Sequence, residues 1–103
     1  EHLMLMMFDT KNRLIKDCLM FKGTVNAAMI NPREIFIEAL KHDAVSIVLV
    51  HNHPSGDPAP STEDIKVTRT MAHAGRLIGI QLLDHLIIGD HRYESLARYL
   101  AEN

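Results

Sequence analysis

Residues 44–50, AVSIVLV, form an almost continuous run of apolar and β-branched side chains, and residues 51–60, HNHPSGDPAP, follow it directly. A short apolar run that stops at polar turn residues is typical of a central strand covered on both faces. Three prolines, Pro54, Pro58 and Pro60, stiffen the following segment and prevent a helix or strand from running through it. The pattern therefore predicts a buried strand that ends in a rigid polar loop.

Hydrophobic periodicity and turn residues predict the elements on both sides of this strand. The expected elements are strands at 3–8 and about 13–21, a helix from Pro32 to about Lys41, the strand at 44–50, a helix from Ser61 to about Ala74, one or two strands within 77–88, and a short last helix from Ser95. Their order, ββαβαββα, describes a mixed β-sheet flanked by helices. We therefore expect a single α/β (α+β) domain over residues 1–103.

Local signals set the boundaries of these elements. The turn-like DTKN at 9–12 separates the first two strands and indicates a hairpin. Asn31 can cap the first helix, Pro32 suits its first position, and Glu34 can complete a capping box. Gly75 is expected to end the second helix, because glycine readily adopts the left-handed conformation that closes helices.

The composition is that of an ordinary globular domain. The apolar fraction is 47% and the charged fraction 23%, which argues against disorder. The formal net charge of −2 gives no broad basic surface for phosphates, so a nucleic-acid partner is not supported by charge. No apolar run approaches the roughly 20 residues that a membrane helix needs.

Cys18 is the only cysteine, so no disulfide can form within the chain, and a reducing compartment such as the cytoplasm is expected. The opening residues also lack the charged start and cleavage site of a signal peptide. Because the chain begins at Glu1 without an initiator methionine, we expect it to be a fragment. The oligomeric state is not indicated by the sequence.

Three side chains that follow the predicted central strand are suited to bind a metal. His51 and His53 are two residues apart, so an extended backbone points both imidazoles to the same side. Open α/β sheets bind ligands beyond the carboxyl ends of their strands, where this pair is expected to lie. Asp64 follows in the first turn of a helix, and the rigid loop can return its carboxylate to the histidines. Two nitrogens and one oxygen would leave a fourth position for water, as in catalytic zinc sites.

Each part of this pattern also has a purely structural interpretation. Ser61 and Asp64 match a plain capping box, in which the carboxylate satisfies backbone donors and binds no metal. Asp84 and His85 lie in an apolar stretch, and neighbours on a strand face opposite ways, so at most one can approach the metal. That residue would support a metal ligand, or the two would form a hydrogen-bonded structural pair. The combined spacing of His51, His53 and Asp64 favours the metal site.

The same spacing resembles a known metalloprotease motif. HNH at 51–53, followed by seven residues, Ser61 and Asp64, matches the JAMM (MPN-plus) motif without a gap. The stretches that resemble the RadC family more narrowly are HNHPSG at 51–56, PREIF at 32–36 and LLDHLIIGD at 82–90. The resemblance covers nearly the whole chain. It implies a JAB/MPN-like architecture, similar to that of cytidine deaminases.

The resemblance also implies an activity and the roles of individual residues. A JAMM domain is a zinc-dependent hydrolase of peptide or isopeptide bonds, with the two histidines and the aspartate as zinc ligands and a peptide or protein as substrate. The motif uses a glutamate before an early strand as general base; Glu1 matches it, and Glu34 and Glu38 are the alternatives. Ser61 would donate a hydrogen bond to the oxyanion.

The chain departs from the RadC pattern in two places, and two other functions stay open. RadC proteins commonly carry an N-terminal helical region that is absent here, so the chain resembles the catalytic-type domain alone. SLARYL at 95–100 lacks a glutamate that the family often shows, a difference expected to affect only the last helix. The alternatives are a DNA repair or DNA-processing role, and a non-catalytic zinc-binding interaction module with a structural ion.

Overall fold

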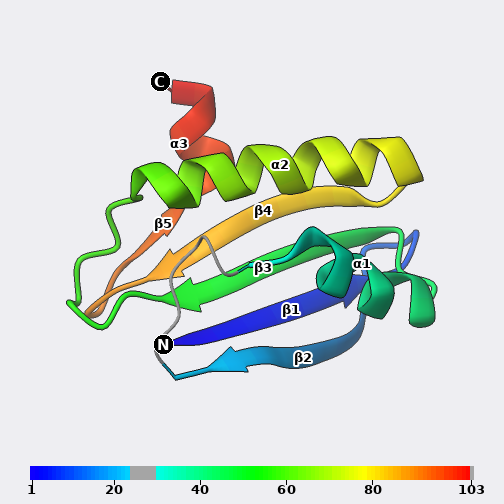
Figure 1. Ribbon diagram of the computed structural model, residues 1–103, viewed down its shortest axis with the longest axis horizontal. Helices are drawn as coiled ribbons and strands as arrows, with labels where there is room; N and C mark the ends of the chain where they lie inside the picture. Colours follow the sequence, from blue (N-terminus) through cyan, green and yellow to red (C-terminus); the bar gives the residue numbers. More distant parts are fainter. Residues whose placement is uncertain (24–29, 103) are drawn as a thin grey trace.

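The computed structural model describes residues 1–23 and 30–102, which form a five-stranded sheet with three helices (Figure 1). The elements are β1 (His2–Phe8), β2 (Leu14–Lys22), α1 (Pro32–Lys41), β3 (Ser46–Asn52), α2 (Thr62–Ile78), β4 (Gln81–Ile88), β5 (Tyr93–Ser95) and α3 (Leu96–Glu102). The strand order is β2-β1-β3-β4-β5, with β3 and β4 parallel and the other neighbours antiparallel. The predicted mixed α/β (α+β) class is confirmed. None of the helices in these two segments is both long and apolar enough to cross a membrane.

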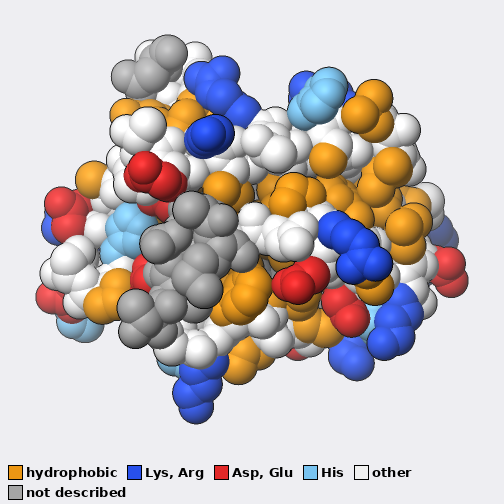
Figure 2. Space-filling view, viewed as in Figure 1, with side chains coloured by type: hydrophobic (Ala, Val, Ile, Leu, Met, Phe, Trp, Pro, Cys, Tyr) orange, Lys and Arg blue, Asp and Glu red, His pale blue; other side chains and the backbone are white. Residues whose placement is uncertain are grey.

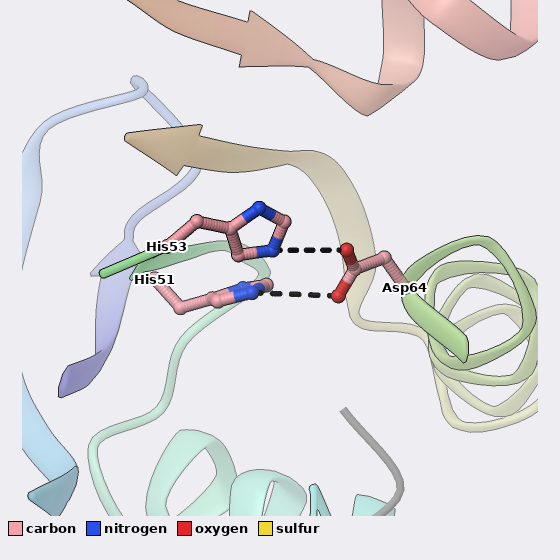
Figure 3. Close-up of side chains that lie close together, drawn as sticks. All are labelled: His51, His53 and Asp64. Atoms are coloured by element: carbon pink, nitrogen blue, oxygen red, sulfur yellow. Dashed lines mark ion pairs between the residues drawn. The ribbon is translucent and has the colours of Figure 1, made fainter. Parts of the chain in front are cut away.

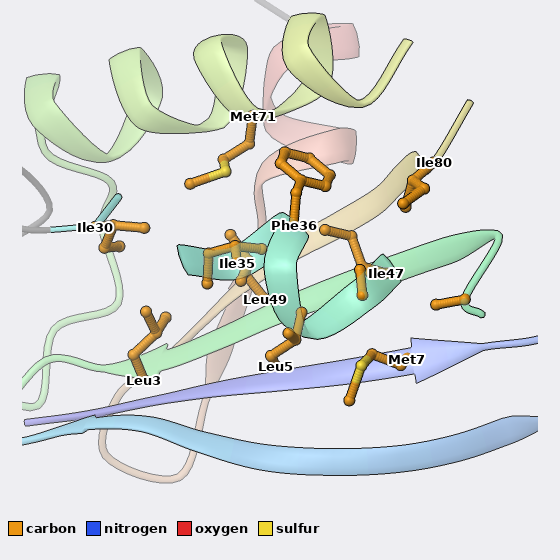
Figure 4. Close-up of a cluster of buried hydrophobic side chains, with 12 residues drawn as sticks. Leu3, Leu5, Met7, Ile30, Ile35, Phe36, Ile47, Leu49, Met71 and Ile80 are labelled. Carbon is orange, nitrogen blue, oxygen red and sulfur yellow. The ribbon is translucent and has the colours of Figure 1, made fainter. Parts of the chain in front are cut away.

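The hydrophobic core lies between the sheet and helices α1 and α2 (Figure 4). Alternate side chains of β1 and β3 point into it, as the two-residue period of a strand requires. The buried cluster consists of Leu3, Leu5, Met7, Ile30, Ile35, Phe36, Ala39, Ala44, Ile47, Leu49, Met71 and Ile80. Met71 of α2 packs in the same cluster as Leu49 of β3, so the core fixes how these two elements lie relative to each other.

The hairpin and the first helix form where the sequence predicts them. β1 and β2 pair antiparallel, and α1 ends at Lys41. Asn31 caps α1, because its side-chain oxygen accepts the Arg33 N–H at 2.9 Å, and Pro32 is the first helical residue. A hydrogen bond from the backbone N–H of Asn31 to the Glu34 carboxylate, which would complete the capping box, stays a prediction.

The central strand is shifted by two residues from its predicted range. β3 begins at Ser46, because the Ala44 N–H still donates to the Ala39 carbonyl at the end of α1, at 2.9 Å. At its other end β3 continues to Asn52, since it keeps pairing with β4 beyond the apolar run. His51 therefore lies within the strand and shares its regular alternation.

The predicted end of the second helix at Gly75 is wrong. α2 continues to Ile78 and ends at Gly79, whose φ of 80° is the left-handed conformation that glycine adopts easily. Gly75 is needed for close packing instead, because a Cβ there would lie 2.1 Å from the carbonyl oxygen of Ile80. Only the contact between α2 and the following chain distinguishes these two glycines.

The region from 77 to 88 holds one strand, β4, and its first residues belong to α2. The second strand of the predicted order, β5, lies after the turn at Gly89 and Asp90 rather than within 77–88. Ser95 caps the last helix as expected, because its Oγ accepts the Arg98 N–H at 3.2 Å.

Candidate metal centre

His51 and His53 come from the carboxyl end of β3 and the start of the following loop (Figure 3). Their ring centroids are 5.0 Å apart, and both rings point to the same side, as strand alternation predicts. His51 is buried, with 7% of its surface exposed, whereas His53 is partly buried. The end of β3 therefore presents two imidazoles toward the start of α2.

Asp64, in the first turn of α2, faces both imidazoles from the other side and is 1% exposed. Its Oδ1 lies 3.4 Å from His51 Nε2, and its Oδ2 lies 3.1 Å from His53 Nε2. One ligand atom from each residue lies within 4.8 Å of the other two. Metal–ligand bonds of about 2.0–2.1 Å in a tetrahedral site place neighbouring ligands roughly 3.3–3.5 Å apart. The two nitrogen–oxygen distances, each to a different carboxylate oxygen, are close to this spacing, and all ligand atoms lie within 4.8 Å, so the three side chains could hold one divalent ion with suitable donors.

The capping box predicted for Ser61 and Asp64 is present at the start of α2. The Ser61 N–H donates to Asp64 Oδ2 at 2.8 Å, and the Asp64 N–H donates to Ser61 Oγ at 3.0 Å. Capping of α2 and metal binding are compatible roles for Asp64, because its Oδ1 stays directed at His51 while the capping hydrogen bond holds the carboxylate. Within the described residues, Ser61 Oγ is engaged only as an acceptor, which leaves its hydroxyl hydrogen available to a substrate.

His53 is oriented by the backbone of the proline-stiffened loop. Its Nδ1 lies 3.0 Å from the carbonyl oxygen of Asp57, and its backbone N–H donates to the Ile88 carbonyl at 2.9 Å. A carbonyl oxygen can only accept, so Nδ1 of His53 carries the hydrogen. The lone pair of Nε2 is then free on the side that faces Asp64.

The loop that carries His53 packs tightly against the turn between β4 and β5. The Asp90 N–H donates to the Gly56 carbonyl at 2.7 Å. A Cβ on Gly89 would lie 2.4 Å from the Gly56 oxygen and 2.7 Å from Pro58 Cδ. Glycine at position 89 is therefore required by the close approach of two backbones.

Gly89→Ala is expected to displace this loop and weaken the binding of a divalent metal by at least tenfold, because the extra methyl group must push the backbone that orients His53. The measurement is a zinc titration of the folded variant. Glu94→Ala, a change at a half-buried position of nearby β5, is the control and should keep the wild-type affinity. Wild-type affinity in Gly89→Ala would show that the loop does not position the ligand.

His85 of β4 lies directly behind His51, and it is fully buried. Its Nε2 is 2.8 Å from His51 Nδ1, and its Nδ1 is 2.8 Å from Thr68 Oγ1 on α2. The expectation that at most one of Asp84 and His85 approaches the metal ligands is met, and His85 is that residue. The Thr68 contact was missed, although its place four residues after Asp64 puts both on one face of a helix.

Asp84 points to the opposite face of the sheet and has a structural role. Its Oδ2 accepts the Ser95 hydroxyl at 2.6 Å, and its Oδ1 accepts the Ala97 N–H at 2.9 Å. Asp84 therefore ties β4 to the start of α3 and takes no part in the metal cluster.

Burial sets the charge state of the two linked imidazoles. Burial, together with the neighbouring His51, lowers the pKa of His85 to about 4. Burial also lowers the pKa of His51, although the carboxylates of Asp64 and Glu1 act in the opposite direction. Both rings are therefore neutral near pH 7, which is the form of histidine that binds metals.

Glu1 is placed beside the cluster by strand pairing. Leu3 of β1 pairs with His51 of β3, so the antiparallel register, continued by two residues, puts Glu1 opposite His53. Glu1 also shares the strand face of Leu3, which points into the core. Two hydrogen bonds with Gly23, at 2.8 and 2.9 Å, hold the backbone of Glu1. Figure 1 accordingly shows the N-terminus next to the carboxyl end of β3.

The two alternative glutamates lie on α1 and are not part of the metal cluster. Glu38 pairs within its own helix, with its carboxylate 3.9 Å from Lys41 Nζ and 3.8 Å from His42 Nδ1. Glu34 lies in the first turn of α1, where a negative charge stabilises the helix start. Of the three candidate glutamates, Glu1 is the one that the strand register places beside the cluster.

Comparisons with known proteins agree with this geometry. A family model described as RadC-like JAB domain matches residues 1–101. A UPF0758 protein of Geobacillus sp. (strain WCH70) is 55% identical over 96 residues, which cover 93% of this chain and 42% of that protein. UPF0758 proteins of Geobacillus thermodenitrificans and Bacillus cereus are 54% and 51% identical over 93% of this chain, and over 42% and 43% of their own lengths. The chain thus spans about two fifths of the length of these curated relatives.

Proposed function

The chain belongs to the family of RadC-like JAB domains, and from this premise we propose that it is a zinc-dependent hydrolase of peptide or isopeptide bonds. The observation that supports the proposal most is the cluster of His51, His53 and Asp64, whose ligand atoms lie within 4.8 Å of one another. Imidazole and carboxylate ligands suit zinc, and three of them leave the open position that catalytic zinc sites keep.

The residues around the cluster have distinct tasks in this mechanism. Zinc, when bound, lowers the pKa of water toward 7 and polarises a carbonyl group. The carboxylate of Glu1 accepts a proton from the attacking water and delivers it to the nitrogen of the leaving amine. The hydroxyl of Ser61, already held by Asp64, donates a hydrogen bond to the oxygen of the attacked carbonyl.

A peptide or protein substrate has a groove available along α2, the helix that carries Asp64, and none of the three cluster residues lines this groove. The groove has a volume of about 520 Å³ and runs along the first half of α2, including Thr62 and Glu63 directly before Asp64. Its floor is apolar, with Ile30, Val67 and Met71 among the lining residues, so it can hold an aliphatic or aromatic side chain. We further propose the cytoplasm as the compartment, because the single Cys18 has no partner cysteine in the chain.

A hydrolysis screen of the purified chain tests the proposal. The substrates are a peptide library and a library of isopeptides in which a lysine side chain carries the scissile amide. We expect cleavage in one of these classes, its loss on chelation, and its return when zinc is added back. Cleavage that survives complete removal of the metal would contradict the proposal.

A structural ion is the second candidate, because the three ligands join the end of β3 to the start of α2. An ion that only joins these elements would raise the melting temperature strongly, since it binds the native state alone. Neither substrate library would then be cleaved by the fully zinc-loaded protein. These two results together would favour a non-catalytic zinc-binding interaction module over a hydrolase.

DNA processing has less support from the charges. Basic and acidic side chains are interspersed on the face shown in Figure 2, and the formal net charge is −2. A DNA-processing domain should bind DNA with an affinity that falls steeply with salt concentration. Such binding, together with a metal-dependent cleavage product, would be needed to prefer this function over the hydrolysis of amide bonds.

A further inference from the structure

A buried chain of hydrogen bonds runs from the backbone of α2 to the first metal ligand. Thr68 Oγ1 lies 2.8 Å from the carbonyl oxygen of Asp64, and His85 Nδ1 lies 2.8 Å from the same hydroxyl. His85 Nε2 then lies 2.8 Å from His51 Nδ1. Thr68 is 5% exposed and His85 is fully buried, so solvent does not replace these partners.

The chemistry of the Asp64 carbonyl, the Thr68 hydroxyl and the two imidazoles fixes the position of each hydrogen in this series of hydrogen bonds. The Asp64 carbonyl can only accept, so the Thr68 hydroxyl donates to it. A hydroxyl has one hydrogen, so toward His85 the hydroxyl can only accept, and Nδ1 of His85 is the donor. A neutral imidazole has one N–H, so His85 Nε2 accepts, and Nδ1 of His51 donates to it. Nε2 of His51, 3.4 Å from Asp64 Oδ1, is left with a free lone pair.

We propose that Thr68 and His85 are positioning residues, which hold His51 in the tautomer whose Nε2 lone pair faces the metal position. The inference rests on the proposed metal-binding role of His51. His53 is held in the same tautomer by one backbone carbonyl, that of Asp57. Both ligands thus have the tautomer that binds a metal before the ion is present. His53 donates directly to a backbone carbonyl, whereas His51 is connected to one, that of Asp64, only through the side chains of His85 and Thr68.

The opposite order of hydrogens leaves one contact unexplained. His51 would carry its hydrogen on Nε2, directed at Asp64, and the Thr68 hydroxyl would donate to His85. The contact of 2.8 Å between Thr68 Oγ1 and the Asp64 carbonyl would then contain no hydrogen. A metal could bind only after the whole order was reversed, so zinc affinity would be lower than in the order we propose.

The tautomer can be read directly from the nitrogen resonances of the two rings in the metal-free protein near pH 7. We expect the hydrogen on Nδ1 in both His51 and His85. Thr68→Val removes the hydroxyl at nearly constant shape, and Thr68→Ser, which keeps the hydroxyl, is the matched control. Thr68→Val should populate the Nε2–H tautomer of His51 and weaken zinc binding by about 10- to 100-fold, while Thr68→Ser keeps the wild-type tautomer and affinity.

A second pair of variants decides the question if Thr68→Val does not fold. His85→Gln keeps an oxygen that can accept from His51 Nδ1, whereas His85→Leu has none. We expect the zinc affinity of His85→Gln to stay within about threefold of wild type and that of His85→Leu to fall by about 10- to 100-fold. Wild-type protein with the hydrogen on Nε2 of His51 would overturn the inference. So would equal zinc affinity in His85→Gln and His85→Leu. The ring spectra do not depend on any substrate, so this inference and the proposed function can fail separately.

Discussion

Glu1→Gln is expected to slow hydrolysis by about 10²- to 10⁴-fold while the protein keeps its zinc. Glutamine has the size of glutamate but cannot accept the proton of the attacking water at neutral pH. The strand register puts Glu1 opposite His53, beside the cluster rather than within it, so the metal ligands stay unchanged. The measurement is kcat on the substrate found by the screen, together with the zinc content of the same sample.

Glu34→Gln and Glu38→Gln are the matched controls for this prediction. Both change a glutamate of α1, and neither side chain belongs to the metal cluster. We expect both controls to hydrolyse the substrate at the wild-type rate. A normal rate in Glu1→Gln, or a large loss in one of the α1 variants, would assign the general base to another residue.

Asp64→Ala is expected to lower zinc affinity by well over the 10- to 100-fold typical of residues that only support a ligand, because it removes the anionic ligand itself. Hydrolysis should be lost in parallel. Zinc affinity is measured by competition with a chelator of known affinity, and hydrolysis on the same substrate. The expected loss comes from geometry, since the Asp64 carboxylate contacts both His51 Nε2 and His53 Nε2.

Asp64 also caps α2, so loss of metal must be separated from loss of the cap. Asp64→Asn keeps an oxygen that can accept the Ser61 N–H, and should melt closer to wild type than Asp64→Ala does. Both variants should nevertheless lose zinc, because the amide oxygen is neutral and a weaker ligand. Wild-type zinc affinity in Asp64→Asn would contradict the assignment of this side chain as an anionic ligand.

The sequence predicted the elements whose signals are local. The apolar run at 44–50 identified the central strand, and Asn31 and Pro32 marked the helix start, because caps and periodicity act over a few residues. The end of α2 could not be predicted in this way. Gly75 and Gly79 carry the same local signal, and only the contact of Gly75 with Ile80 shows that the first is a packing position.

The same distinction holds for the candidate metal centre. Strand alternation and the position of the helix start predicted that His51, His53 and Asp64 lie close together, and the structure has them in one cluster. The roles of Thr68 and His85 depend on how α2 packs on β4, which no local pattern contains. The sequence offered Asp84 or His85 as the support of a ligand, and the packing of α2 on β4 selects His85 and adds Thr68.

The most direct test of the metal centre is a calorimetric zinc titration of the metal-free chain, with His53→Ala measured in parallel. We predict saturable binding of about one zinc per wild-type chain, and its loss in His53→Ala, because this variant removes one of three ligands. Absence of saturable binding in the wild type, or an unchanged titration in His53→Ala, would contradict a metal site at the junction of β3 and α2.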